Sequence, residues 1–347
     1  MEKNLKGKLY NNDENKINPN SKNSKFKLVK HLRIRNKSIE KALILQDGNL
    51  LAYYNGNILI FDKNDFSIKN KYEIKKALNG NIHEIVQLKN GKIACCLKCL
   101  PNLWSRRIII LDISKNNIEL NQVLKPIFKG QFINIVGSLP SWELVLSEVG
   151  FCEFFELKNK KFVLKEKIQF KDHFFALNIF ELEKDKILLN ACYDSISNFR
   201  EDEFCLKSVI LIYDISNNKK ELLFKIDPIK EFRYTNDKPI LLNNKCLVFI
   251  KFDKPFGLIV FDIKYMEFVT IICPKNQNII SCITKLSENL FLVGEYNGYV
   301  TLYSFEKNEF HEIRKEKLTK KLYKISKFNE KKFFLIDEKI IKIYEIN

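Results

Sequence analysis

The residue types best suited to bind a metal ion are three closely spaced cysteines, Cys95, Cys96 and Cys99. Cys96 and Cys99 have the CxxC spacing of zinc ligands, but a structural zinc site needs four ligands, usually as two close pairs, and no second pair stands out. Cys95 and Cys96 are neighbours on an expected strand, so their side chains point to opposite faces. We therefore predict that these thiols pack as small hydrophobic groups, with no metal and no cofactor.

The histidines show no catalytic pattern. None of them has the HxH or HExxH spacing of a metal site, and they are His31, His83, His173 and His311. The chain also has no nucleophile elbow, Walker loop or paired-glycine phosphate cradle. The sequence therefore predicts no catalytic residues and a protein that is not an enzyme.

Aromatic and arginine side chains occur in several expected loops, and these residue types often anchor protein interfaces. Tyr53 and Tyr54 are expected on the same face as the predicted partner-binding residues. That set is Trp104, Arg106, Arg107, Phe199, Arg200, Arg233, Phe256 and Tyr296. Arginine pairs suit a carboxylate-bearing peptide, so an acidic segment of another protein is the expected partner. The competing interpretation is that loops are simply where exposed residues lie.

A second candidate surface is basic. The stretch 314–332 holds nine Lys or Arg and two Glu, and 25–37 adds six basic residues and no acid. The predicted basic rim is Arg314, Lys315, Lys317, Lys320, Lys321, Lys324 and Lys327. Binding of an acidic partner, an acidic membrane or RNA is the functional interpretation. The favoured structural interpretation is that Lys on outer strands discourages edge-to-edge aggregation.

The bulk composition limits these interpretations. The chain has 347 residues and a net charge of +17, and the basic excess is almost entirely Lys, in a composition also rich in Asn, Ile and Phe. Composition alone can therefore account for the charge. The nine cysteines show no regular spacing, which favours a reducing compartment. No signal peptide or apolar run of about 20 residues is found, so we expect a cytoplasmic protein, with the nucleus not excluded.

The elements that must position these residues are short strands in a repeated unit. The clearest unit is 279–305, where polar turns join three strands and Asn297-Gly298 forms a strong hairpin signal. Each unit ends its third strand in an apolar residue followed by a polar one. We call these the marker pairs: Phe61-Asp62, Leu111-Asp112, Phe155-Glu156, Tyr213-Asp214, Phe261-Asp262, Tyr303-Ser304 and Tyr344-Glu345.

Seven units of four strands, with a period of roughly 40–45 residues, are typical of a β-propeller. The last unit, within 322–346, has only three strands, whereas 26–34 is a strand without a neighbour in the sequence. We predict that this strand pairs with the last unit and closes the ring. An antiparallel sandwich or a two-domain β protein is the alternative.

The units resemble divergent WD repeats in their length, their strand–turn–strand order and their aromatic–acid endings, over about residues 26–347. No unit carries the Trp-Asp dipeptide, and no Gly-His pair precedes one. The resemblance implies an all-β, seven-bladed propeller. The Asn/Lys-rich composition of 1–25, with almost no large apolar residues, predicts a disordered tail before it. The resemblance also implies a monomeric, non-catalytic platform for other proteins in a larger assembly. The alternatives are RNA or acidic-membrane binding through a rim of blades six and seven, and, as the least favoured, an enzyme with a site in the channel.

Overall fold

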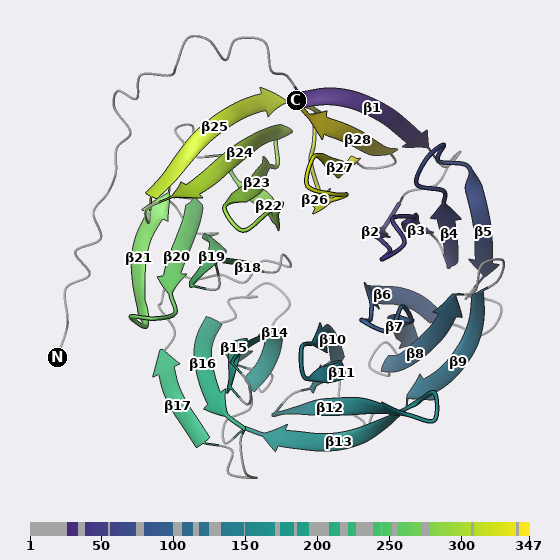
Figure 1. Ribbon diagram of the computed structural model, residues 1–347, viewed down its shortest axis with the longest axis vertical. Helices are drawn as coiled ribbons and strands as arrows, with labels where there is room; N and C mark the ends of the chain where they lie inside the picture. Colours follow the sequence, from purple (N-terminus) through teal and green to yellow (C-terminus); the bar gives the residue numbers. More distant parts are fainter. Residues whose placement is uncertain are drawn as a thin grey trace, which may run out of the picture. The chain divides into compact units, whose positions relative to one another are not determined.

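The structure is a computed structural model that describes most of the chain after residue 25. The described residues are 26–33, 39–54, 56–73, 80–99, 106–113, 118–124, 133–148, 150–170, 174–183, 186–193, 208–215, 221–226, 239–243, 245–251, 256–272, 278–306, 309–337 and 340–347. The predicted tail at 1–25 lies outside them. The described residues contain strands and no helix (Figure 1). None of them forms a helix of the length and hydropathy needed to cross a membrane.

The strands form seven antiparallel sheets of four strands, which are the blades of a seven-bladed β-propeller. The chain divides into two compact units, with unit 1 comprising 1–36 and 235–347 and unit 2 comprising 37–234. The prediction of an all-β propeller is confirmed. We number the blades in chain order.

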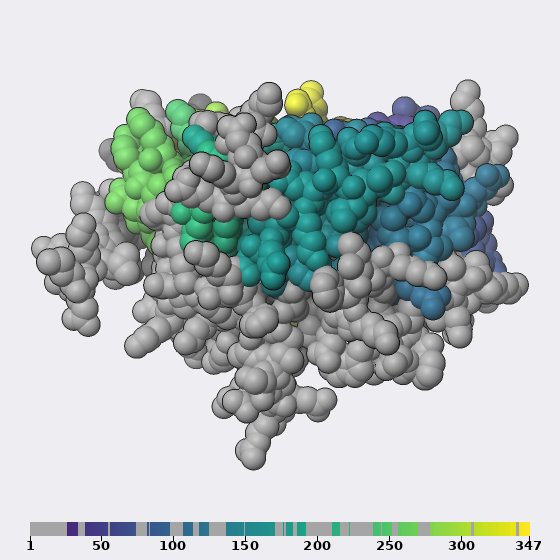
Figure 2. All heavy atoms as spheres, turned by 90° about the horizontal axis from the view of Figure 1, so that it is seen from below, coloured from purple at the N-terminus to yellow at the C-terminus, as the bar shows by residue number. Residues whose placement is uncertain are grey.

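Unit 2 holds blades one to four. Blade one consists of β2 (Lys41–Ile44), β3 (Leu50–Tyr54), β4 (Asn57–Phe61) and β5 (Ile68–Glu73), and blade two of β6 (Gly80–Gln87), β7 (Ile93–Cys99), β8 (Arg106–Ile113) and β9 (Ile118–Leu124). Blade three consists of β10 (Ile133–Leu139), β11 (Trp142–Glu148), β12 (Phe151–Lys158) and β13 (Lys161–Gln169), and blade four of β14 (Phe174–Glu183), β15 (Lys186–Tyr193), β16 (Ser208–Asp214) and β17 (Glu221–Ile226). The β10–β13 sheet forms much of the teal surface in Figure 2.

Unit 1 holds blades five to seven. Their strands are β18 (Ile240–Leu242), β19 (Cys246–Lys251), β20 (Gly257–Asp262) and β21 (Glu267–Ile272); β22 (Ile280–Lys285), β23 (Leu290–Glu295), β24 (Tyr299–Glu306) and β25 (Glu309–Lys317); and β26 (Lys324–Lys327), β27 (Lys332–Asp337), β28 (Ile340–Ile346) and β1 (Phe26–Arg33).

The predicted closing strand is confirmed. Strand β1 pairs antiparallel with β28, from Phe26 opposite Ile346 to Arg33 opposite Ile340, and so supplies the outer strand of blade seven (Figure 1). Phe26 is buried against the edge of the Phe333 ring, with 5.2 Å between the ring centroids. The two ends of the described chain are therefore held in one sheet.

Within each unit, the core lies between the faces of successive blades. Many strands carry apolar residues on both faces. Because successive side chains of a strand point to opposite faces of the sheet, each blade can pack against the blade before it and the blade after it. Cys95 packs in one core cluster of unit 2 and Cys96 in another, and both side chains are buried. The prediction that these two cysteines are hydrophobic packing groups is thus confirmed, while the Cys99 side chain lies outside the described residues.

A β-bulge accompanies the marker pair in every blade. Where the third strand reaches its marker pair, its pairing with the outer strand skips one outer-strand residue, which has no opposite residue. The skipped residues are Lys69, Asn121, Lys165, Leu223, Val269, Ile313 and Val29, in the order of blades one to seven. The sequence repeat therefore marks a local change in twist at the same point of each sheet.

Candidate interaction surface

The predicted partner-binding residues fall into three groups. Arg106 and Arg107 lie on β8 in unit 2, and the Arg107 side chain is exposed. Phe256 is half-buried just before β20, and Tyr296 is exposed in the turn between β23 and β24, both in unit 1. The remaining predicted residues lie outside the described residues: Trp104, Phe199, Arg200 and Arg233.

The expectation that Tyr53 and Tyr54 lie on an exposed face is wrong. Tyr53 is completely buried, and its hydroxyl oxygen accepts hydrogen bonds from the backbone N–H groups of Gly56 (3.2 Å) and Ile82 (2.9 Å). Burial raises the pKa of the Tyr53 hydroxyl. Tyr54 is also buried. Tyr53 therefore ties blade one to the first strand of blade two rather than to a partner.

The turn that carries Tyr296 is fixed by hydrogen bonds to residues 318–323, which link blade six to blade seven. Gly298 has a φ of +91°, and a Cβ at this position would lie 1.9 Å from the carbonyl oxygen of Thr319. Glycine allows both the backbone angle and the close approach. The N–H of Leu318 donates to the Gly298 carbonyl (3.0 Å), and the N–H of Leu322 donates to the Tyr296 carbonyl (3.1 Å). Turn and link thus form one rigid backbone unit.

Two tyrosine rings stand on this backbone unit. Tyr296 is 43% exposed and Tyr323 is 45% exposed, and their rings meet edge to face at 6.1 Å between centroids. Lys320 and Lys321 are exposed on the link that leads to Tyr323. We call Tyr296, Tyr323, Lys320 and Lys321 the tyrosine surface. It brings together residues that the sequence assigned to two separate sets.

A partly buried polar network of blade seven also holds the link. Thr319 donates a hydrogen bond to Asp337, and the Lys342 ammonium donates to the same carboxylate at 3.0 Å. The Tyr344 hydroxyl donates to the Leu318 carbonyl at 3.2 Å. The link is therefore held by side chains of blade seven as well as by the turn of blade six.

The predicted basic rim is not one surface. Lys324 and Lys327 lie on β26, the inner strand of blade seven, and this corrects their placement on an outer rim. Arg314 lies over the Phe26 ring at 5.0 Å and donates to the Asn347 carbonyl at 3.2 Å, so it contributes to closing the sheet. Lys315 pairs with the buried Glu295 carboxylate. Lys317 is exposed and lies 5.6 Å from the Tyr299 ring centre.

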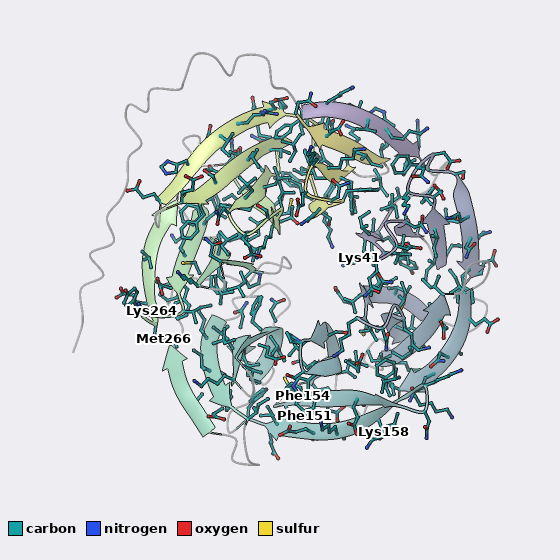
Figure 3. All side chains as sticks on the ribbon, viewed as in Figure 1. Lys41, Phe151, Phe154, Lys158, Lys264 and Met266 are labelled. Carbon is teal, nitrogen blue, oxygen red and sulfur yellow. The ribbon has the colours of Figure 1, made fainter. Side chains whose placement is uncertain are left out.

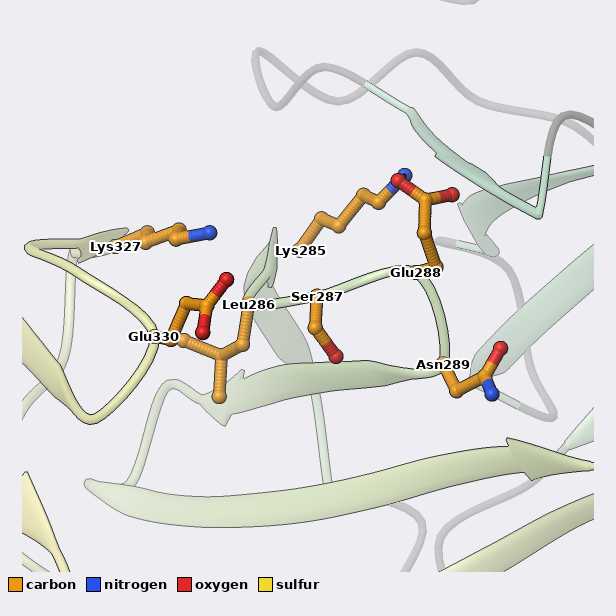
Figure 4. Close-up of a pocket in the computed structure, with 7 residues that line it drawn as sticks. All are labelled: Lys285, Leu286, Ser287, Glu288, Asn289, Lys327 and Glu330. Carbon is orange, nitrogen blue, oxygen red and sulfur yellow. Dashed lines mark hydrogen bonds and ion pairs between the residues drawn. The ribbon is translucent and has the colours of Figure 1, made fainter.

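A shallow polar pocket of about 540 Å³ opens between the β22–β23 and β26–β27 turns in unit 1 (Figure 4). Its lining residues are Lys285, Leu286, Ser287, Glu288, Asn289, Lys327 and Glu330. Lys285 donates to the Glu288 carboxylate at 2.7 Å and lowers the pKa of Glu288. Charges of both signs line this pocket, so it offers no strong field for an ion of either sign.

The sequence reasoning missed a pair of buried carboxylates in blade three. Glu148 and Glu153 are each only 1% exposed, and neither oxygen of Glu148 has a hydrogen-bond partner. Burial and the nearby Glu153 charge raise the pKa of Glu148 to about 7, against the opposing effect of Lys167. The available signal was Glu148 at the end of WELVLSE and Glu153 within FCEFFELK, each next to a run of apolar residues.

No group of three His, Cys, Asp or Glu in the described residues is placed to hold a metal ion. Burial raises the pKa of the Cys95 thiol well above its ordinary value and that of Cys152 to about 12, so both thiols stay protonated at neutral pH.

No protein-family model matches the chain, and no curated protein matches it in sequence. Solved structures match it in fold. A structure of the RRP9 WD40 repeats is 9% identical, with a TM-score of 0.66 over 93% of this chain and 100% of that chain. A structure of U3-55K is 9% identical, with a TM-score of 0.64 over 92% of this chain and 98% of that chain.

A third match is to Raptor from Chaetomium thermophilum, at 8% identity and a TM-score of 0.68, over 93% of this chain and 29% of that one. At these identities, the likeness shows the fold. The chain is a seven-bladed β-propeller of the type found in WD40-repeat structures, and its resemblance to WD repeats is confirmed at that level.

Proposed function

We propose that this protein is a non-catalytic platform that holds a partner protein through the tyrosine surface of unit 1. The observation that carries the proposal is the Tyr296–Tyr323 pair, two exposed rings on a backbone fixed by hydrogen bonds. Tyrosine supplies a large contact area with only two side-chain torsions to order, and a rigid mounting lowers the entropy cost of binding. Both features suit a protein interface.

The chemistry beside the rings favours an acidic segment of the partner. Lys320 and Lys321 are exposed on the same link as Tyr323, and Lys317 is exposed at the end of β25. Exposed lysines attract carboxylates and raise the association rate, while the rings supply affinity. A propeller suits the role of a platform because loops mounted on a rigid scaffold keep their geometry.

RNA binding through the basic residues is the competing function. It is weakened because Arg314 and Lys315 are engaged in contacts within the fold. Single strands are bound by stacking bases on aromatic rings, and the edge-to-face tyrosine pair offers no parallel stack.

The test compares the full-length protein with the double variant Tyr296→Ala/Tyr323→Ala. Tagged proteins are recovered from cells of the source organism, partners are identified by mass spectrometry, and the affinity of a recovered partner is then measured with purified protein. We expect the double variant to keep its melting temperature within a few degrees and to lose about 2 kcal/mol or more of binding free energy. The matched control is Tyr265→Ala in the β20–β21 turn between Lys264 and Met266 (Figure 3), because Tyr265 is also exposed.

Two results would overturn the proposal. One is full partner affinity in a folded Tyr296→Ala/Tyr323→Ala protein. The other is tight RNA binding at physiological salt that is abolished by Lys320→Glu/Lys321→Glu, because a weak lysine-driven attraction would disappear at that salt concentration.

A further inference from the structure

The skipped outer-strand residues of blades five to seven differ in kind from those of blades one to three. In unit 2, the skipped residues whose side chains are described are polar: Lys69, Asn121 and Lys165. Lys69 pairs with Asp62 of its marker pair at 2.8 Å, and Lys165 lies 3.9 Å from Glu156 of its own. These two lysines cover the bulge with charge, which discourages contact with another chain.

In unit 1, all three skipped residues are β-branched and apolar. Val29 is 39% exposed, Val269 is 42% exposed and Ile313 is 50% exposed. Single exposed apolar residues are common and need no explanation. They recur at one structural position on three successive outer strands, where blades one to three carry polar residues and blade four carries Leu223.

The strand β1 concentrates this apolar surface. Leu28 is exposed beside Val29, so two adjacent aliphatic side chains face solvent at the edge of blade seven. Exposed basic residues surround them, namely Lys27, Lys30, His31 and Arg33, and β1 contains no acidic residue. The bulge between Leu28 and Lys30 interrupts the regular backbone ladder, which disfavours simple addition of another strand.

We propose that β1 is a second docking surface, which binds an acidic segment of a partner protein through its aliphatic side chains. Leu28 and Val29 supply the buried contact, and the surrounding cations select carboxylates in the segment. Such a surface is separate from the tyrosine surface and does not depend on it. It gives the protein two points of attachment, as a platform requires.

The test uses three fluorescent peptides of equal length and the full-length protein at physiological salt. One peptide combines Glu with Leu, one combines Lys with Leu, and one combines Glu with Ser. We expect the Glu/Leu peptide to bind at least tenfold more tightly than the other two. Leu28→Ser/Val29→Ser and, separately, Lys27→Glu/Lys30→Glu should each weaken that binding at least tenfold.

Two control variants locate the binding. Ile68→Ser changes an exposed aliphatic residue on the outer strand β5 of unit 2 and should leave peptide affinity unchanged. Tyr296→Ala/Tyr323→Ala should also leave it unchanged, which separates this surface from the tyrosine surface.

Equal binding of the three peptides overturns the proposal, as does loss of binding only in the tyrosine variant. Tighter binding of phosphatidylserine vesicles or polyuridine RNA than of the Glu/Leu peptide, lost in Lys27→Glu/Lys30→Glu, would assign β1 to a membrane or to RNA instead. If the apolar variant fails to fold, the charge variant decides between these outcomes, because its substituted residues are exposed.

Discussion

Blades three and six carry a buried carboxylate at the same position, but only the carboxylate of blade six has hydrogen-bond and ion-pair partners. Glu295 ends β23 in blade six and Glu148 ends β11 in blade three, and each is 1% exposed. Glu295 accepts a hydrogen bond from the Asn278 amide at 2.8 Å and pairs with Lys315. Neither oxygen of Glu148 has a hydrogen-bond partner.

The strand registers trace this difference to one residue. Lys315 lies opposite Thr301 in blade six, and Lys167 lies opposite Glu153 at the matching place in blade three. One lysine serves one carboxylate in blade six, whereas in blade three the corresponding lysine faces two. Lys167 also lies 3.6 Å from the centre of the Phe151 ring. A buried charge is tolerated when it is paired and is costly when it is not.

Among the substitutions that test this comparison, removal of Lys315 from blade six should change the free energy of unfolding most. Lys315→Ala leaves the Glu295 carboxylate buried without its cation, and breaking such a pair costs about 3–5 kcal/mol of the free energy of unfolding. Urea denaturation of the full-length protein measures the loss. Lys317→Ala, two residues further along β25, is the control and should cost less than about 0.5 kcal/mol. Equal losses in the two variants would mean that the Lys315–Glu295 pair is not a stabilising interaction.

A substitution that makes blade three resemble blade six should raise the free energy of unfolding, by a smaller amount. Glu153→Thr removes the second carboxylate, so Lys167 faces Glu148 alone, and we expect a gain of about 2 kcal/mol in the free energy of unfolding at pH 8. The pKa of Glu148 should fall, which NMR titration of its carboxyl carbon would show. Glu156→Thr on the same strand serves as the control, because Glu156 forms partly exposed ion pairs with Lys158 and Lys165. Destabilisation by Glu153→Thr would show that the carboxylate pair is compensated by another contact.

The smallest expected effect depends on pH. The pKa of Glu148 in the folded protein is raised to about 7, so between pH about 4.5 and 7 the folded state holds a proton that the unfolded state has lost. Stability from this group is present at low pH and falls as the pH rises through that range. Glu148→Gln should therefore remove this slope and raise the free energy of unfolding at pH 8 by about 1 kcal/mol, since the buried amide still lacks a partner.

Melting temperatures at pH 5 and pH 8 test this prediction. The melting temperature of Glu148→Gln should exceed that of the unsubstituted protein at pH 8, and by more than any difference at pH 5. The same difference at both pH values would show that Glu148 does not titrate differently in the folded and unfolded states.

The blades were predictable from sequence because their signals are local. Each marker pair ends a third strand, and counting strands was enough to assign β1 to blade seven. The bulges were not predicted, because skipping one outer-strand residue leaves the apolar pattern of the third strand unchanged. Their positions follow the marker pairs so regularly that the pairs now serve as the signal.

The candidate site residues were harder to predict because their exposure depends on contacts between blades. Tyr54 and Tyr296 each directly precede an Asn-Gly pair in the sequence, yet Tyr54 is buried and Tyr296 is exposed. The basic run was misplaced because it crosses from the outer strand β25 to the inner strand β26, and charge alone does not show that crossing. The sequence predicted Tyr296 but gave no reason to place it beside Tyr323.

The close approach of Gly298 to Thr319 has a kinetic consequence. Because the Asn297-Gly298 turn and the blade six–seven link share hydrogen bonds and leave no room for a side chain between them, neither segment can rearrange alone. A partner that binds the tyrosine surface, as proposed, would then meet a backbone that needs no rearrangement. Association with the tyrosine surface should proceed in one step, at a rate proportional to partner concentration and with no slower phase from loop reordering.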